Sequence, residues 1–171
     1  MQTHFLNMKK ISLIILSFVI LTSLGCANFI MPEVGSTAKP EARIELGESD
    51  ITVAMWQTDY ATLIYSISGT GAEVKFSGQL EFHDRLTNTY NVIQNLYLKM
   101  SFINSQGQVL SVVDISPMFS YSNTIPANME IAKSFTKPQG TSGIVFSYYG
   151  VFLGASTDPG QRWEIFHFPF E

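Results

Sequence analysis

The chain has 171 residues, with 10 lysines and arginines against 14 aspartates and glutamates, and its formal net charge at pH 7 is −4. An acidic chain with no basic cluster lacks the phosphate-neutralising surface that nucleic-acid binding requires, so we expect no nucleic-acid partner. Because Cys26 is the one cysteine, no intramolecular disulfide can form.

The N-terminal residues have the three-part pattern of a secretory signal peptide. Lys9 and Lys10 precede an uncharged, apolar run at residues 11–24, which ends just before Cys26. A run of about 14 residues is typical of a signal peptide and is short for a membrane-spanning helix. We therefore expect residues 1–25 to be a signal peptide.

The residues around Cys26 resemble the signal of bacterial lipoproteins. Gly25 and Cys26 match the end of that motif, Ser23 stands where leucine is commonest, and the resemblance covers residues 8–27. It implies that Cys26 becomes the first residue of the mature protein and carries acyl chains such as palmitate. Ala27, in place of the aspartate that favours inner-membrane retention, implies that the protein is anchored in the outer membrane.

Two alternatives to the lipid anchor remain. The uncharged stretch from Ile11 to Met31 has about 21 residues, which is long enough for an uncleaved membrane anchor, although its second half is polar. Otherwise the protein is secreted after ordinary cleavage, and Cys26 has no role. Removal of residues 1–25 takes away two lysines and leaves 8 basic and 14 acidic side chains. The resulting net charge of −6 argues against docking on anionic lipid.

The remainder of the chain divides into a tether and one domain. Residues 26–48 have no sustained hydrophobic period and contain prolines and several charges, which predicts a flexible tether between the lipid and the domain. In residues 49–171, hydrophobic alternation of period two predicts a single all-β domain. Ile51, Val53 and Met55 alternate with polar or small neighbours and predict its first strand.

Three later segments define the predicted domain further. Residues 74–82 have apolar side chains on one face and mostly polar ones on the other, which indicates a half-buried antiparallel strand. Asn104–Gly107 lies between two apolar runs and predicts a hairpin turn. Residues 144–153 are apolar on nearly both faces, which favours a central strand. Seven or eight short strands with regular turn signals predict an antiparallel β-sandwich.

Residues 72–150 contain a recognisable order of short patterns. A Phe-Ser-Gly-Gln strand at residues 76–79 is followed by a Ser-Gln-Gly hairpin at 105–107 and a Pro-Ala-Asn turn at 126–128. This order is similar to that of small immunoglobulin-like or fibronectin-like modules of bacterial envelope proteins, including the FxLYD type. The resemblance implies an immunoglobulin-like sandwich that acts as a binding or architectural unit without catalysis.

Few residues are candidates for catalysis or metal binding. His83, Asp84 and Arg85 form the densest polar cluster, in which His83 would be a base and Asp84 its carboxylate partner. A solvated strand end is the simpler interpretation, because His83 continues the polar face of the 74–82 strand. His167 and His83 lack the spacing of known zinc motifs. We expect no metal, no cofactor and no catalytic residue.

Aromatic residues are concentrated near the C-terminus. Trp163, Phe166, Phe168 and Phe170 place apolar groups on both faces of a terminal edge strand, which cannot easily bury all of them. Aromatic side chains left exposed would form a patch for an envelope partner. The alternative is that a neighbouring loop or the tether covers them.

Together these observations favour a non-enzymatic, lipid-anchored protein whose β-sandwich contacts another envelope or surface component. Two alternatives stay open. The sandwich could carry an apolar ligand in a cavity between its sheets, or His83 and Asp84 could be the centre of an enzyme.

Overall fold

The structure is a computed structural model that describes residues 31–47, 51–69, 71–119, 124–154 and 161–171. Pro32–Glu171 form one compact unit. The predicted signal peptide and Cys26 lie outside the described residues. Within those residues, no helix is both long and apolar enough to cross a membrane.

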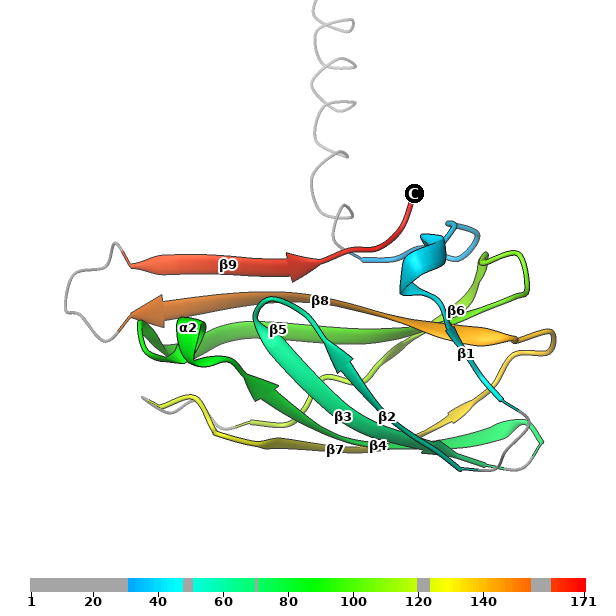
Figure 1. Cartoon of the computed structure of the whole chain (residues 1–171), viewed down its shortest axis with the longest axis horizontal. Coiled ribbons are helices and arrows are strands. Elements are labelled where there is room, and N and C mark those ends of the chain that lie inside the picture. The colour runs from blue at the N-terminus through cyan, green and yellow to red at the C-terminus, as the bar shows by residue number, and fades with distance from the viewer. Residues whose placement is uncertain (1–30, 48–50, 70, 120–123, 155–160) are drawn as a thin grey trace, which may run out of the picture. The chain divides into compact units, whose positions relative to one another are not determined.

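Two antiparallel sheets make up the compact unit (Figure 1). The four-stranded sheet has the order β2-β3-β4-β7, with bounds Ile51–Gln57, Ala61–Ser68, Glu73–Phe82 and Met129–Thr136. The five-stranded sheet has the order β1-β8-β5-β6, and β9 also pairs with β8. The strands of this sheet are β1 (Ile44–Glu45), β5 (Tyr90–Ile103), β6 (Val109–Asp114), β8 (Gly143–Gly154) and β9 (Arg162–His167). Two single-turn helices are η1 (Pro40–Ala42) and α2 (Asp84–Thr87).

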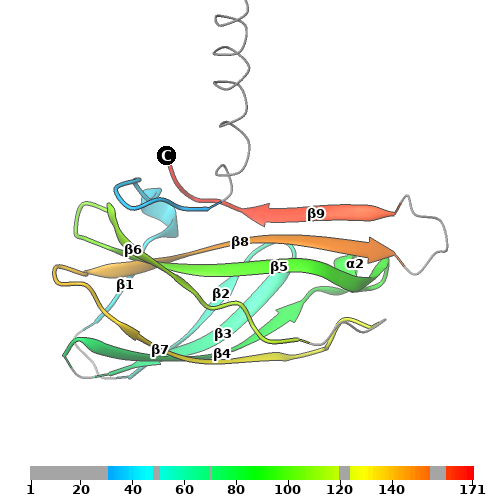
Figure 2. The same ribbon diagram turned by 180° about the vertical axis from the view of Figure 1, so that it is seen from behind.

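The connections between the sheets confirm the expected immunoglobulin-like sandwich. The chain changes sheets between β1 and β2, between β4 and β5, between β6 and β7, and between β7 and β8. As a result β7 pairs with β4 and β8 pairs with β5, which is the cross-connected order of this kind of sandwich. Figure 2 shows the two layers from behind. The described residues contain nine strands, rather than the seven or eight expected, because β1 lies in the predicted tether.

The core lies between the two sheets and follows the alternation of the sequence. In β4, Val74, Phe76, Leu80 and Phe82 are buried, and the side chains between them are exposed or half-buried, as predicted. Strand β8 is central, also as predicted, because β5 pairs along one of its edges while β1 and β9 pair end to end along the other. Burial of each large side chain contributes about 2 to 3 kcal/mol to the free energy of unfolding.

Strand β2 forms where the alternation predicts it, but Val53 and Met55 face solvent. Val53 is 72% exposed and Met55 is 65% exposed. The neighbouring Ala54 and Trp56 pack against the core instead. The Trp56 ring contacts Phe146 of β8 at a centroid distance of 5.2 Å, and burial of this larger side chain determines which face of β2 turns inward.

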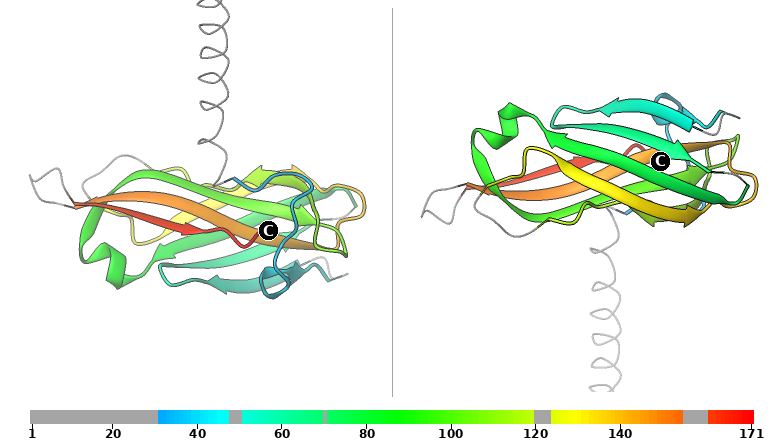
Figure 3. Two further views of the ribbon diagram at one scale, coloured as in Figure 1. Left: turned by 90° about the horizontal axis from the view of Figure 1, so that it is seen from above. Right: turned by 90° about the horizontal axis from the view of Figure 1, so that it is seen from below.

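The prediction of a flexible tether is wrong for residues 32–47, which belong to the folded unit (Figure 3). The Gly35 amide donates to the carbonyl of Val109 at 2.9 Å, and the Glu171 amide donates to the carbonyl of Thr37 at 2.9 Å. The segment therefore forms backbone hydrogen bonds to the β5–β6 hairpin and to the C-terminal residues. These bonds join parts of the chain that are far apart in sequence, so they leave no local period that sequence analysis can detect.

A second, small core fastens this segment to the domain. Its buried members are Ala38, Ile103, Val109, Val145 and Phe170. Val145 lies one residue from the inward-facing Ile144 and Phe146, so it points away from the main core. The small core therefore covers part of the outer face of the five-stranded sheet, and the folded domain begins near residue 32 rather than at residue 49.

Candidate functional site

A row of three aromatic residues crosses the outer face of the five-stranded sheet. Tyr97 of β5 is the register partner of Tyr149 of β8, which in turn is the partner of Phe166 of β9. Phe166 is 69% exposed, Tyr97 is 42% exposed, and Tyr149 is half-buried between them. We call these three residues the aromatic row.

Charged side chains beside the aromatic row are paired with one another. The Arg162 guanidinium lies 2.7 Å from a carboxylate oxygen of Glu164, and the Lys99 ammonium contacts the carboxylate of Asp114. Burial and a hydrogen bond with Glu164 raise the pKa of Tyr149, so its hydroxyl is neutral at physiological pH. The charges balance within each of these two pairs, and Asp114 also lies 3.6 Å from the Lys133 ammonium.

The four aromatic residues singled out near the C-terminus do not form one patch. Phe166 is exposed as expected, and Trp163 is 44% exposed but lies on the opposite face of β9, where it stacks on Tyr90 with a centroid distance of 6.3 Å. Phe168 is half-buried against the small core, and Phe170 is buried within it. For Phe168 and Phe170 the alternative interpretation holds, because the segment expected to be a tether covers them.

A shallow groove crosses the outer face of the four-stranded sheet. Its small residues Ser66, Ser77 and Ala132 are register partners on β3, β4 and β7, and Val53 and Ile64 line one end. The groove has a volume of about 470 Å³. We call it the sheet groove. Sequence analysis missed it because the row of small residues emerges only when the strand pairings are known.

An apolar rim borders the sheet groove. Ile64 is 49% exposed, and its register partner Met55 and nearby Val53 are still more exposed. Within the groove, the Ser66 and Ser77 hydroxyl oxygens are 2.7 Å apart and hydrogen-bond to each other. The groove thus combines three large exposed apolar side chains with hydroxyl groups that already have partners, and Gln79 and Glu130 also line it.

The ring of His83 contacts residues from the β2–β3 turn and β3. The Nε2 atom lies 2.8 Å from the Thr62 hydroxyl, and Nδ1 lies 3.2 Å from the main-chain carbonyl of Asp59. Both ring nitrogens are therefore occupied by groups other than the proposed partner Asp84. Arg85 lies over the Tyr60 ring at 5.1 Å. These contacts hold the turn that begins helix α2.

His167 lies apart from His83, in an aromatic cluster where β2 and β9 approach each other. Its ring packs against Trp56 at a centroid distance of 5.4 Å and stacks on Tyr148 at 6.0 Å. Burial, with a smaller effect from the Lys39 charge, lowers the pKa of His167. Across the described part of the chain, no three His, Cys, Asp or Glu residues are grouped closely enough to hold a metal ion.

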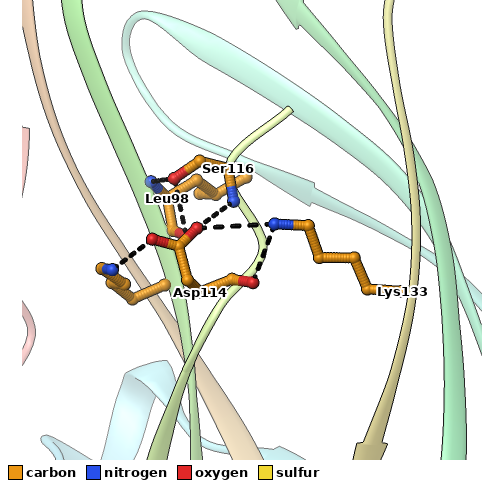
Figure 4. A network of polar contacts seen from close by, with 5 residues as sticks. Leu98, Asp114, Ser116 and Lys133 are labelled. Carbon is orange, nitrogen blue, oxygen red and sulfur yellow. Dashed lines mark hydrogen bonds and ion pairs between the residues drawn. The ribbon is translucent and has the colours of Figure 1, made fainter. Parts of the chain in front are cut away.

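Asp114 of β6 joins the two sheets at the edge of the sandwich where β6 lies near β7 (Figure 4). Lys133 of β7 donates to the Asp114 main-chain carbonyl at 3.0 Å and lies 3.6 Å from its carboxylate. Burial by itself raises the pKa of Asp114, but hydrogen bonds from Lys99 and Ser116 outweigh burial and lower the pKa to about 2. The carboxylate therefore stays ionised and fixes β6 against β7.

No protein-family model, curated protein or solved structure matches the chain. Function is therefore inferred from the residues and their geometry. The described residues offer two exposed apolar surfaces, one on each sheet, and the polar clusters at His83 and Asp114 are hydrogen-bonded to neighbouring elements.

Proposed function

We propose that the chain is a non-enzymatic envelope protein, held in the outer membrane by acyl chains on Cys26, whose β-sandwich contacts another envelope protein. The anchor is supported by the lipoprotein-type sequence that ends at Cys26. The observation that carries the contact is the exposed apolar rim of the sheet groove, formed by Val53, Met55 and Ile64. Contiguous apolar surface of this kind is typical of sites that a partner covers.

The position of the sheet groove suits a contact with a partner. The segment that leads from Cys26 crosses the five-stranded sheet, whereas the groove lies on the outer face of the four-stranded sheet. An anchored chain would therefore leave the groove accessible. Small side chains along its length admit an extended segment or an inserted side chain, and the rim supplies the apolar contact.

The two alternatives from the sequence have less support. For a carrier, a ligand would need space between the sheets, but Phe146 is in ring contact there with Trp56, Tyr65 and Phe76. For an enzyme, the ring nitrogens of His83 would have to leave Thr62 and the Asp59 carbonyl. A contact with a partner protein requires neither a cavity between the sheets nor a rearrangement of His83.

The anchor is tested by labelling cells with a clickable fatty acid. We expect the wild-type chain to become labelled and the Cys26→Ser chain to remain unlabelled and to stay unprocessed. A matched control is Ser23→Leu, which brings the sequence closer to the lipoprotein pattern and should keep the label. A wild-type chain without label would contradict the lipid anchor.

The contact is tested by photo-cross-linking in intact cells. A photoreactive amino acid at Met55 should give a discrete cross-linked product, which Ile64→Lys should abolish because it places a charge on the rim. The matched control position is Glu45 of β1, which is also exposed but lies on the other sheet. Equal products from Met55 and Glu45 would contradict a contact at the sheet groove.

A further inference from the structure

The connection between Cys26 and the folded domain is short. Five residues, 27–31, separate Cys26 from Pro32, which is already buried in the domain. This length of chain spans at most about 20 Å when fully extended. If Cys26 carries a lipid, the surface around Pro32 cannot move far from the bilayer.

The residues after Pro32 lead onto the outer face of the five-stranded sheet. Ala38 packs in the small core against Val145, which points outward from β8. Phe168, just beyond the end of β9, packs against the same core, and Phe166 precedes it by two residues on the outer face of β9. Two residues of a strand cover about 7 Å, so the aromatic row lies close to the fastened segment.

This region exposes apolar and aromatic side chains. Phe166 and Tyr97 belong to the aromatic row, while Val34 is 70% exposed in the segment next to the anchor. Tyrosine and other aromatic residues favour the headgroup region of a bilayer, where the ring is partly buried and a hydroxyl stays hydrated.

The charges on this region neither attract nor repel a bilayer strongly. Arg162 is paired with Glu164, and Lys99 is paired with Asp114. In the fastened segment the exposed carboxylates Glu33 and Glu41 outnumber Lys39, so the region carries a small negative excess and no basic patch, and a contact with zwitterionic lipid requires none. The contact would therefore be apolar and insensitive to salt.

We propose that, in the acylated protein, the outer face of the five-stranded sheet lies against the bilayer surface, with Tyr97, Tyr149 and Phe166 in the headgroup region. This inference rests on the proposed acylation of Cys26. A connection of five residues keeps the local concentration of lipid high, so the contact needs little intrinsic affinity. The sheet groove, on the other side of the sandwich, then points away from the membrane.

The test uses the full-length acylated protein in phosphatidylcholine vesicles. The lipid occupies the sulfur of Cys26, so an introduced cysteine is the one free thiol that a fluorophore can label. One label replaces Asn95, which is exposed on the same face as the aromatic row, and the matched control replaces Ala132, which is exposed on the four-stranded sheet. Quenching is measured with lipids that carry a nitroxide on the headgroup.

We expect several-fold stronger quenching at Asn95→Cys than at Ala132→Cys, unchanged in high salt. Replacing both Tyr97 and Phe166 by serine should reduce the Asn95 signal to the level of the control. The control double replacement, Val53→Ser with Met55→Ser on the four-stranded sheet, should leave the quenching at Asn95→Cys unchanged.

The outcomes separate this inference from the proposed function. Intact mass, measured first on the same sample, shows whether Cys26 is acylated. An unmodified wild-type chain would contradict the proposed function itself. An acylated chain with equal quenching at the two label positions would overturn the bilayer contact and leave the anchor intact.

Discussion

Ala38 and Phe170 form an isolated antiparallel bridge that joins the segment after Cys26 to the C-terminal end of the chain. Both side chains are buried, in a small core separate from the one between the sheets. The two ends of the domain thus hold each other in place on the outer face of the five-stranded sheet. This relationship shortens the connection to Cys26 from the long tether expected to five residues.

Replacement of Phe170 should loosen the N-terminal segment. We expect Phe170→Ala to lower the free energy of unfolding by about 3 kcal/mol, because it removes a buried ring and leaves a cavity. Hydrogen exchange at the Gly35 and Ala38 amides should accelerate as well. The matched control is Phe166→Ala, an exposed site where the loss should be about 0.5 kcal/mol or less. Similar losses in the two variants would contradict the burial of Phe170.

Gly107 should tolerate alanine less well than Gly140. Both glycines have positive φ, 85° and 83°, so a Cβ strains the backbone at either position by about 1 kcal/mol or more. At Gly140 the added Cβ meets open space, whereas at Gly107 it collides with the Arg43 guanidinium. That guanidinium donates two hydrogen bonds to the Ala38 carbonyl, at 2.7 and 3.0 Å.

We therefore expect Gly107→Ala to be the more destabilising variant in urea unfolding, by at least about 1 kcal/mol, because it also breaks charge-assisted hydrogen bonds. Faster hydrogen exchange in the N-terminal segment should accompany the Gly107 change and not the Gly140 change. Equal effects would mean that Arg43 does not hold the segment.

Local patterns in the sequence were sufficient to predict the main strands. Residues 74–82 alternate apolar and polar side chains because one face of β4 is buried and the other is solvated. Gly107 follows a polar turn between apolar runs, and its positive φ closes the β5–β6 hairpin as expected. These features depend only on residues that are adjacent in the sequence, so they can be predicted from a single sequence.

Features that depend on distant pairings could not be predicted. Val53 and Trp56 are both nonpolar, and the inward side is Trp56 because its ring packs against Phe146, Tyr148 and His167, which are distant in sequence. The sheet groove requires Ser77 and Ala132 to be register partners, which no local pattern indicates. The fastening of the N-terminal segment likewise depends on hydrogen bonds to residues that are distant in sequence, such as Val109 and Glu171.

The Asp114 network should contribute to stability at neutral pH and lose its effect in acid. The folded chain lowers the pKa of Asp114 from 3.8 to about 2, so the unfolded chain binds the proton more readily. The contribution is therefore complete above pH 4 and disappears as the pH falls through about 2. Because the carboxylate is 47% exposed, we discount the shift for solvent screening and expect about 1 kcal/mol.

Urea unfolding of the wild type and Asp114→Asn at pH 7 and pH 2.5 tests this expectation. The difference in unfolding free energy should be present at pH 7 and should shrink at pH 2.5. Lys133→Met should reproduce part of the loss at pH 7, since it removes the contact between the sheets. A difference between wild type and Asp114→Asn that does not change with pH would contradict the lowered pKa.

His167 should make stability depend on pH in a higher range. Burial holds its pKa below the usual 6.5, so the unfolded chain binds a proton that the folded chain does not. The contribution of the neutral His167 ring to the free energy of unfolding is therefore complete above pH 6.5 and decreases as the pH falls below 6.5. We expect the wild type to lose stability between pH 7 and pH 5.

The matched variant is His167→Phe, which keeps a ring against Trp56 and Tyr148 but cannot be protonated. Its unfolding free energy should fall less than that of the wild type over the same pH range. An NMR titration of His167 should give a midpoint below 6.5. A midpoint above that value would contradict the effect of burial.

The most direct test of the lipid-anchored assignment is the intact mass of the mature protein purified from the envelope of the cells that make it. We predict a chain that begins at Cys26, with the added mass of two or three acyl chains confined to the N-terminal peptide. A chain that begins upstream of Cys26, or that begins at Cys26 without added mass, would contradict it.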